Sequence, residues 1–282
     1  MEIRWHDMQA SKLYVNSRHN VVWLTWPAIE NLPGILHGFS TRLGGVSQGM
    51  FSSMNLSFSR GDAREAVEEN YRRLGKAMGF SPEELVVSSQ THTTNVRVVT
   101  KADCGNLFDE SRAFHDVDGM ITDEPGVVLA TFYADCVPSY FVDPVHHAIG
   151  LSHSGWRGTV GKMAAETAKR MRETFGTRPE ELITAIGPSI CQNCYEVGED
   201  VAGQFRLAFD SKYHPALLKE APGGKYHLNL WEANRICLLE AGVPAKNIHL
   251  PNLCTCCNPD FLFSHRATGG KRGNMGAFLG LK

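Results

Sequence analysis

The sequence predicts an α+β fold in which mixed β-sheets are sandwiched by helices. The chain has 282 residues, of which 43% are hydrophobic, and this is enough to bury a large core. Short apolar runs typical of buried strands occur beside segments with helical periodicity, but the two kinds do not alternate strictly along the chain. This order favours mixed sheets with helices outside over a doubly wound parallel sheet.

The chain shows no internal repeat, low-complexity tract or long Pro/Gly/Ser linker that would separate two cores. We therefore expect residues 1–282 to form a single domain. The segment at 221–225, APGGK, has the strongest loop composition, and we expect it to be a surface excursion.

Apolar residues at helical spacing predict four helices. The first begins with Asp62 as the N-cap and Glu65 three residues later, a capping-box pattern. Val67, Tyr71 and Leu74 then share one face, and the helix is predicted to end before a glycine at 79. The other three helices are predicted at 159–175, 199–209 and 229–241.

Six short apolar runs predict strands, because each is rich in β-branched or aromatic residues and is bounded by polar or turn-forming residues. They lie at 85–87, 96–99, 127–133, 140–142, 148–151 and 182–186.

Charge and composition exclude several classes of function. A formal net charge of -2 gives no broad positive field, so we expect no nucleic-acid polymer as a partner. Residues 1–20 contain no apolar run of the kind found in signal peptides, and no segment has the length of a membrane span. We therefore expect a cytoplasmic protein without a membrane partner, whose eight cysteines stay reduced.

Asp135 and Cys136 follow the predicted strand at 127–133, and His153 follows the one at 148–151. Side chains at strand ends are held rigidly and remain accessible to ligands. Taken singly, Cys136 is equally explained as a small buried apolar residue and His153 as a core histidine. We assign Cys136, His153 and Asp135 as candidate catalytic residues.

His92 lies in a polar run between two predicted strands, and it completes a possible zinc site with Cys136 and His153. Imidazole and thiolate are preferred zinc ligands. Three protein ligands leave a fourth position for water or substrate, as in catalytic zinc sites, and bound water would then have a pKa of about 7.

Two other uses of the cysteines stay open. Cys191 and Cys194 could form a closed structural zinc site with the cluster Cys254, Cys256 and Cys257, although we interpret the second cluster as having a one-residue gap that is unusual for zinc.

A cysteine hydrolase is the other alternative, acting on an amide or a cell-wall precursor. In it Cys136 is the nucleophile, His153 the base, and Asp135 or Asp118 orients the histidine. Spatial arrangement and metal content distinguish the two interpretations.

Arg42 and Arg157 are candidate phosphate ligands, because both lie beside glycines whose backbone N–H groups an anion can approach closely. Arg157 also precedes the predicted helix at 159–175. Structural ion pairs explain both arginines equally well. Arg266, in the segment FLFSHR, is a weaker candidate for the same pocket.

The chain resembles the laccase-domain family, once called polyphenol oxidases and now associated with purine nucleoside phosphorylases. The resemblance rests on blocks that occur in family order between His37 and Arg266: HGFSTRLGGVS, QTH, DVDGMIT, ADCVP, SHSGWRGT, GPSI, CYEV, CTCC and FLFSHR. The tail departs from the family, because its usual Thr-Gly-Arg is replaced by a Lys-Arg-Gly at 271–273.

The resemblance implies that His92, Cys136 and His153 are zinc ligands. It also implies an αββα fold related to the catalytic domain of the cytotoxic necrotizing factor toxins. The implied activity is phosphorolysis of adenosine, inosine and methylthioadenosine, with adenosine deamination as a second reaction. The expected partners are a purine nucleoside and phosphate, bound by Arg42, Gln90, Asp118 and Arg157 in a monomer or small homo-oligomer.

A multicopper oxidase is disfavoured, because a trinuclear copper cluster needs many imidazoles in closely spaced pairs. The chain has 12 histidines but no His-x-His pair. Copper is expected only as a substitute at the zinc site, since it outcompetes zinc at many nitrogen and sulfur sites.

Overall fold

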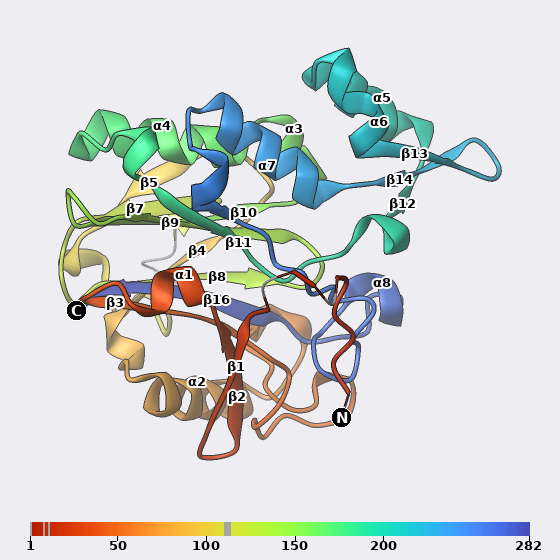
Figure 1. Cartoon of the computed structure of the whole chain (residues 1–282). Coiled ribbons are helices and arrows are strands. Elements are labelled where there is room, and N and C mark those ends of the chain that lie inside the picture. The colour runs from red at the N-terminus through yellow and green to blue at the C-terminus, as the bar shows by residue number, and fades with distance from the viewer. Residues whose placement is uncertain (1, 8, 11, 110–113) are drawn as a thin grey trace.

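Two β-sheets packed face to face form the centre of the molecule, and helices cover both outer faces (Figure 1). The computed structural model describes residues 2–7, 9–10, 12–109 and 114–282. The layers follow the order helix, sheet, sheet, helix, with α4 and α7 on one side and α2 on the other. The predicted α+β arrangement of mixed sheets between helices is confirmed.

The first sheet has seven strands in the order β1-β2-β3-β16-β8-β4-β6. The C-terminal strand β16 lies between β3 and β8 and pairs antiparallel with both, whereas β4 and β8 are parallel. The strands are β1 (Tyr14–Arg18), β2 (Val21–Thr25), β3 (Ile35–Ser40), β4 (Leu85–Ser89), β6 (Phe114–His115), β8 (Val128–Tyr133) and β16 (Met275–Leu281).

The second sheet has six strands in the order β15-β11-β9-β10-β7-β5. Its central pair is antiparallel, and the register sets His153 of β10 opposite Pro138 of β9. The strands are β5 (Val96–Val98), β7 (Gly119–Thr122), β9 (Val137–Asp143), β10 (Ala148–Ser154), β11 (Ile183–Ile186) and β15 (Ile248–His249). All six predicted strands are confirmed as parts of β4, β5, β8, β9, β10 and β11.

A third sheet, in the order β12-β14-β13, stands beside the sandwich with the helices α5 and α6 (Figure 1). It comprises β12 (Glu196–Val197), β13 (Leu218–Ala221) and β14 (Lys225–Leu228). The APGGK segment forms the turn between β13 and β14, and its two glycines have φ of 73° and 69°. The expected surface excursion is therefore the tip of a hairpin.

The helices are α1 (Pro27–Glu30), α2 (Arg64–Met78), α3 (Trp156–Val160), α4 (Met163–Phe175), α5 (Glu199–Ala208), α6 (His214–Leu217), α7 (Leu230–Glu240) and α8 (His265–Thr268). The apolar face predicted for α2 is buried, with Val67, Tyr71 and Leu74 inaccessible to solvent.

Two helix predictions are wrong in detail. The N-cap of α2 is Ala63, one residue beyond Asp62, whose carboxylate instead accepts hydrogen bonds from the Ala63 N–H and the Asn55 amide. The helix predicted at 159–175 is two helices, α3 and α4, interrupted where Lys162 adopts a left-handed φ of 62°. Because α3 already begins at Trp156, Arg157 lies inside this short helix.

Three apolar clusters fill the spaces between the layers. The first lies between the two sheets and includes Leu129 of β8, Leu151 of β10 and Leu279 of β16. A second joins the β9–β10 sheet to α4 and α7, and a third joins the β3–β16 sheet to α2. The sandwich thus fixes the ends of β4, β8 and β10 against one another, and the candidate site forms there.

Candidate functional site

His92, Cys136 and His153 converge at one edge of the sandwich. Their nearest ligand-type atoms all lie within 4.8 Å of one another, and the Cys136 Sγ is 3.8 Å from the His92 Nε2. His92 belongs to the loop after β4, Cys136 to the turn between β8 and β9, and His153 to the end of β10. Two imidazoles and one thiol within this span suit the donor preferences and coordination distances of zinc. The residues present therefore fit a single metal ion.

Asp118, just before β7, organises two of these three side chains. It is fully buried, and its carboxylate accepts hydrogen bonds from the backbone N–H groups of Thr91, His92 and Thr93, at 3.1, 3.1 and 2.9 Å. It also accepts from the Thr93 hydroxyl at 3.0 Å and pairs with the His153 Nδ1 at 2.8 Å. This contact leaves the His153 Nε2 available to a ligand, the usual arrangement of a metal-bound histidine with a carboxylate behind it.

Charges at the cluster shift the pKa values of Cys136, His153 and Asp118. Burial opposes ionisation of Cys136, but the charge and hydrogen bonds of His153 and His92 outweigh it and lower the thiol pKa to about 6. Burial likewise opposes protonation of His153, but Cys136 and Asp118 raise its pKa to about 9. Burial would raise the pKa of Asp118, yet His153 and the backbone N–H donors lower it to about 2.

Backbone geometry at the cluster is unusual. His92 and Asp135 have positive φ values of 68° and 86°, in the left-handed region that few non-glycine residues adopt. A Cβ placed on Gly155 would lie 2.5 Å from the His92 ring and 3.3 Å from the Cys136 Sγ. Only glycine therefore fits at 155 with the ring of His92 in its present position.

A polar cavity of about 270 Å³ opens on one side of the cluster. His92, Cys136 and His153 line it together with Arg60, Arg272 and the side chains of Ser57, Ser59, Ser88, Ser89, Gln90, Phe132, Ala134 and Asn274. Arg272 is buried, and desolvation together with the like charge of Arg60 lowers its pKa to about 10. The Nε of Arg272 has no protein hydrogen-bond partner among the described residues. Two guanidinium groups in one cavity make it a strong candidate for binding an anion.

A smaller, more apolar cavity of about 110 Å³ also borders this cluster. His92 and Cys136 border both cavities. The remaining walls come from Asp135, Gly155, Trp156, Arg157, Ile190, Tyr195 and Leu230. Burial raises the pKa of the Tyr195 hydroxyl to about 12, so this group remains a hydrogen-bond donor at neutral pH. An aromatic, largely apolar space of this kind suits a flat heterocycle.

Asp135, Gln90 and Asp118, which we expected at the site, all lie there but are occupied by framework contacts. Asp135 accepts hydrogen bonds from the Thr255 hydroxyl and the backbone N–H of Arg266. Gln90 exchanges two hydrogen bonds with the backbone of Phe132, at 2.7 and 3.0 Å. The contacts of Gln90 and Asp118 position the loop that carries His92, and Gln90 also lines the polar cavity.

The two arginines expected to bind phosphate lie in different places. Arg157 lines the apolar cavity. Arg42 donates to the carbonyls of Ser52 and Pro259 and packs on the ring of Phe263 at 4.6 Å. Arg42 is not one of the described residues that line either cavity. The structure therefore gives Arg42 a framework role.

Sequence reasoning missed Arg60 and Arg272. Arg272 belongs to the glycine-rich tail that departs from the family pattern, and that tail leads directly into β16. Arg60 lies on a short turn between β3 and α2, with no motif around it. Only the pairing of β16 between β3 and β8 brings these two loops to the same cavity.

The chain matches a protein-family model described as multi-copper polyphenol oxidoreductase laccase over residues 36–282. The chain belongs to this family.

Several relatives in this laccase family carry the name purine nucleoside phosphorylase. YlmD of Geobacillus stearothermophilus is 41% identical over 248 residues, covering 88% of this chain and 90% of YlmD. A Bacteroides thetaiotaomicron relative is 38% identical over 253 residues, covering 89% and 93%. Human LACC1 is 32% identical over 88% of this chain, which spans only 56% of that longer protein.

Solved structures of the family share the fold. The crystal structure of YlmD from Geobacillus stearothermophilus superposes with a TM-score of 0.90 at 37% identity, covering 96% of this chain and 100% of that one. A Bacillus licheniformis protein named YfiH gives a TM-score of 0.88 at 32% identity, covering 95% and 99%. Within the described residues of this chain, no helix has the length and apolar character needed to cross a bilayer.

Proposed function

We propose that the chain is a metal-dependent purine nucleoside phosphorylase, which cleaves the N-glycosidic bond with inorganic phosphate. The observation that carries this proposal is the meeting of two chemically different cavities at His92 and Cys136, one cationic and one aromatic. Phosphorolysis needs both, because an anion must attack the anomeric carbon on the face opposite the departing purine. The names of the bacterial and mammalian relatives support the same activity.

Zinc is the metal that we propose for His92, Cys136 and His153, on the basis of their donor set. When bound at these three residues, zinc would supply a Lewis acid. Among the described residues, each of the clusters that could hold a metal contains at most two histidines, a set too small for a trinuclear copper centre. Copper at this site would be a substitute for zinc.

Phosphate is proposed to bind between Arg60 and Arg272. Arg272 is buried, and its Nη1 donates to the Gly273 carbonyl and the Asn274 side chain, while its Nε has no protein acceptor among the described residues. An anion in the cavity would add to the compensation for burying this charge. Serine hydroxyls in the same cavity can donate further hydrogen bonds to the phosphate oxygens. Arg60 is exposed at the cavity mouth, where it attracts the anion from solvent.

The purine is proposed to lie in the apolar cavity against Trp156 and Tyr195. Departure of the base requires a donor to the developing negative charge on the purine ring. The Tyr195 hydroxyl and the Arg157 guanidinium both border this cavity and can donate at neutral pH. The ribose then spans the boundary between the cavities, with its anomeric carbon between the base and the phosphate.

We propose adenosine, inosine and methylthioadenosine as substrates, with hydrolytic deamination of adenosine as a weaker reaction. Deamination replaces the 6-amino group by an oxygen atom from water, releases ammonia and needs no phosphate. It therefore requires the aromatic cavity and the metal cluster but not the arginine pair.

Incubation of the zinc-loaded protein with adenosine, with and without phosphate, tests this proposal by chromatography of the products. We expect adenine and ribose 1-phosphate only when phosphate is present, and a smaller amount of inosine in both mixtures. If no purine nucleoside is turned over under either condition, the proposed activity is wrong.

Arg272→Gln tests the phosphate site. Loss of a charge-assisted contact of about 1.5–3 kcal/mol should lower kcat/KM for phosphate by about 10- to 100-fold. Deamination should be nearly unchanged. Arg170→Gln, at an exposed position on α4, is the matched control and should leave both reactions intact. Equal losses of phosphorolysis and deamination in Arg272→Gln would assign Arg272 a structural role.

A cysteine hydrolase is the second candidate, and one observation favours it. Asp118, His153 and Cys136 form a chain in which the acid orients the histidine and the thiol pKa is lowered to about 6. Of the two acids we considered as the orienting residue, the structure pairs Asp118 with the histidine. A metal-free protein that hydrolyses amides, and that loses this activity on alkylation of Cys136, would support the hydrolase over the phosphorylase.

A further inference from the structure

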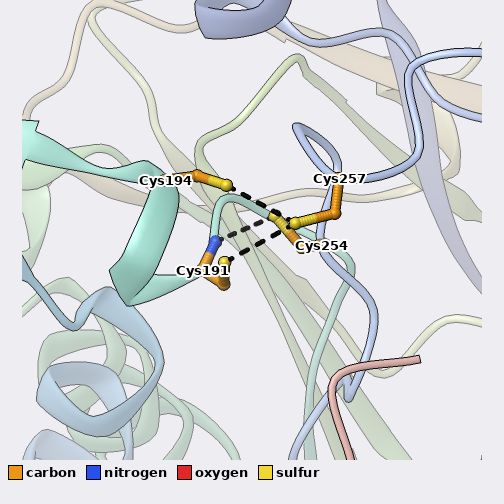
Figure 2. A group of neighbouring side chains, drawn as sticks. All are labelled: Cys191, Cys194, Cys254 and Cys257. Atoms are coloured by element: carbon orange, nitrogen blue, oxygen red, sulfur yellow. Dashed lines mark hydrogen bonds between the residues drawn. The ribbon is translucent and has the colours of Figure 1, made fainter. Parts of the chain in front are cut away.

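Four cysteines from two separate loops converge outside the site described above (Figure 2). Cys191 and Cys194 flank the short turn before β12, and Cys254 and Cys257 lie in the loop between β15 and α8. The four Sγ atoms all lie within 4.8 Å of one another. The Cys257 Sγ lies 3.4 Å from that of Cys194 and 4.0 Å from that of Cys191.

Each loop contributes a Cys-x-x-Cys pair. The structure pairs Cys254 with Cys257 and leaves Cys256 out of the group, so our interpretation of a one-residue gap in this cluster is wrong. Two Cys-x-x-Cys turns facing one another are the usual ligand set of a closed structural zinc site.

The geometry of the group fits one ion better than simple packing of thiols. Four sulfur atoms at about 2.3 Å from a central zinc are separated from one another by roughly 3.8 Å. The separations of the Cys257 Sγ from those of Cys194 and Cys191, 3.4 and 4.0 Å, lie on either side of that value. The backbone N–H of Cys191 also donates to the Cys254 Sγ at 3.2 Å, the kind of contact that stabilises a thiolate ligand.

We propose that Cys191, Cys194, Cys254 and Cys257 bind one zinc ion as a tetrathiolate structural site, separate from the site at His92. Binding releases the thiol protons to solvent and forms four Zn–S bonds, with no change of oxidation state. Because all four positions are protein sulfurs, this ion has no open position for substrate.

The site clamps two loops that build the apolar cavity. Ile190 and Tyr195, which line that cavity, directly flank the first cysteine pair. Thr255, between the second pair, donates its hydroxyl to Asp135 at 2.6 Å. Zinc in this site would therefore hold one wall of the cavity in place. This last consequence rests on the proposed function, whereas zinc binding itself does not.

Native mass spectrometry of the reduced, zinc-replete full chain tests the proposal by counting metal ions. We expect two zinc ions for the wild type and one for Cys191→Ser and Cys257→Ser. Cys136→Ala should also retain one, because it removes a ligand of the other site. Cys104→Ser and Cys256→Ser are the matched controls, and both should retain two.

X-ray absorption at the zinc edge of Cys136→Ala gives a measurement that does not depend on the loop variants folding. The remaining ion should show four sulfur neighbours at about 2.3 Å and no nitrogen or oxygen. Loss of all zinc in Cys136→Ala, a full complement of zinc in Cys257→Ser, or a loss of zinc in Cys256→Ser would overturn the assignment. So would a Cys194–Cys257 disulfide in the purified protein. None of these results depends on turnover, so failure of the phosphorylase activity would leave the metal count as an independent finding.

Discussion

Replacement of Asp118 by asparagine should weaken both the metal site and the fold. The carboxylate accepts five hydrogen bonds, three from backbone N–H groups, one from the Thr93 hydroxyl and one from the His153 Nδ1. Asparagine keeps one oxygen and presents an amide N–H₂ in place of the other. At least two of the five donors then face another donor.

The magnitude follows from these lost acceptors. Each buried donor left without a partner costs about 1–3 kcal/mol, so Asp118→Asn should lower the free energy of unfolding by about 2–6 kcal/mol. If the new amide donates to the His153 Nδ1, the proton moves to Nε2 and blocks the nitrogen that faces the cluster. Loss of such a supporting contact lowers metal affinity by about 10- to 100-fold.

The difference in stability between wild type and Asp118→Asn should also depend on pH. The pKa of Asp118 is lowered to about 2 in the folded chain, against about 3.9 for an unfolded aspartate. Its contribution is therefore complete above pH 4 and is lost as the pH falls through 2, so the two unfolding free energies should approach each other at acid pH.

Denaturant unfolding and competition with a chromophoric zinc chelator measure the two effects. Asp116→Asn is the matched control, since Asp116 is exposed in the adjoining segment and its carboxylate accepts only a hydroxyl contact from Thr91 in the described structure. Its unfolding free energy and zinc affinity should stay close to wild type. If Asp118→Asn binds zinc as tightly as Asp116→Asn does, then Asp118 does not orient the metal ligands.

Three further predictions concern the metal cluster and the loop beside it. Between pH 6 and 9 the metal-free pair is a Cys136 thiolate and a His153 imidazolium, so zinc binding displaces one proton from His153. Zinc affinity, measured by chelator titration, should therefore rise about tenfold per pH unit and reach a plateau above pH 9. An affinity that does not change with pH would contradict this pair. Gly155→Ala should displace the His92 ring, which lies 2.5 Å from the added Cβ, and zinc affinity should drop while the midpoint of thermal unfolding of the metal-free protein changes little. Asn70→Ala removes the hydrogen-bond partner of three backbone groups in the loop before α2. The free energy of unfolding, measured by urea titration, should fall by about 3 kcal/mol. A decrease below about 1 kcal/mol would show that water replaces the amide.

Much of the architecture could be predicted from local sequence patterns. The run at 127–133 is apolar on both faces, and it forms a strand buried between two neighbours in the centre of its sheet. Val67, Tyr71 and Leu74 recur at helical spacing, and the face that they form on α2 is buried. The break at Lys162 could not be seen, because the apolar spacing continues across it. In the fold both α3 and α4 contact α7.

The sequence by itself determined the α+β class, the strands β8 and β10 that lead to Cys136 and His153, and the chemical types of the candidate ligands. These properties depend on residues close together in the chain, where periodicity and donor chemistry can be recognised directly. Tertiary structure alone decided which distant residues meet. It brings Arg60 and Arg272 into the cavity, removes Arg42 from it, turns Asp118 toward His153, and joins two cysteine pairs that lie about sixty residues apart. The physical reason is that strand order, which places β16 between β3 and β8, is fixed by burial of the whole sandwich and by no local signal.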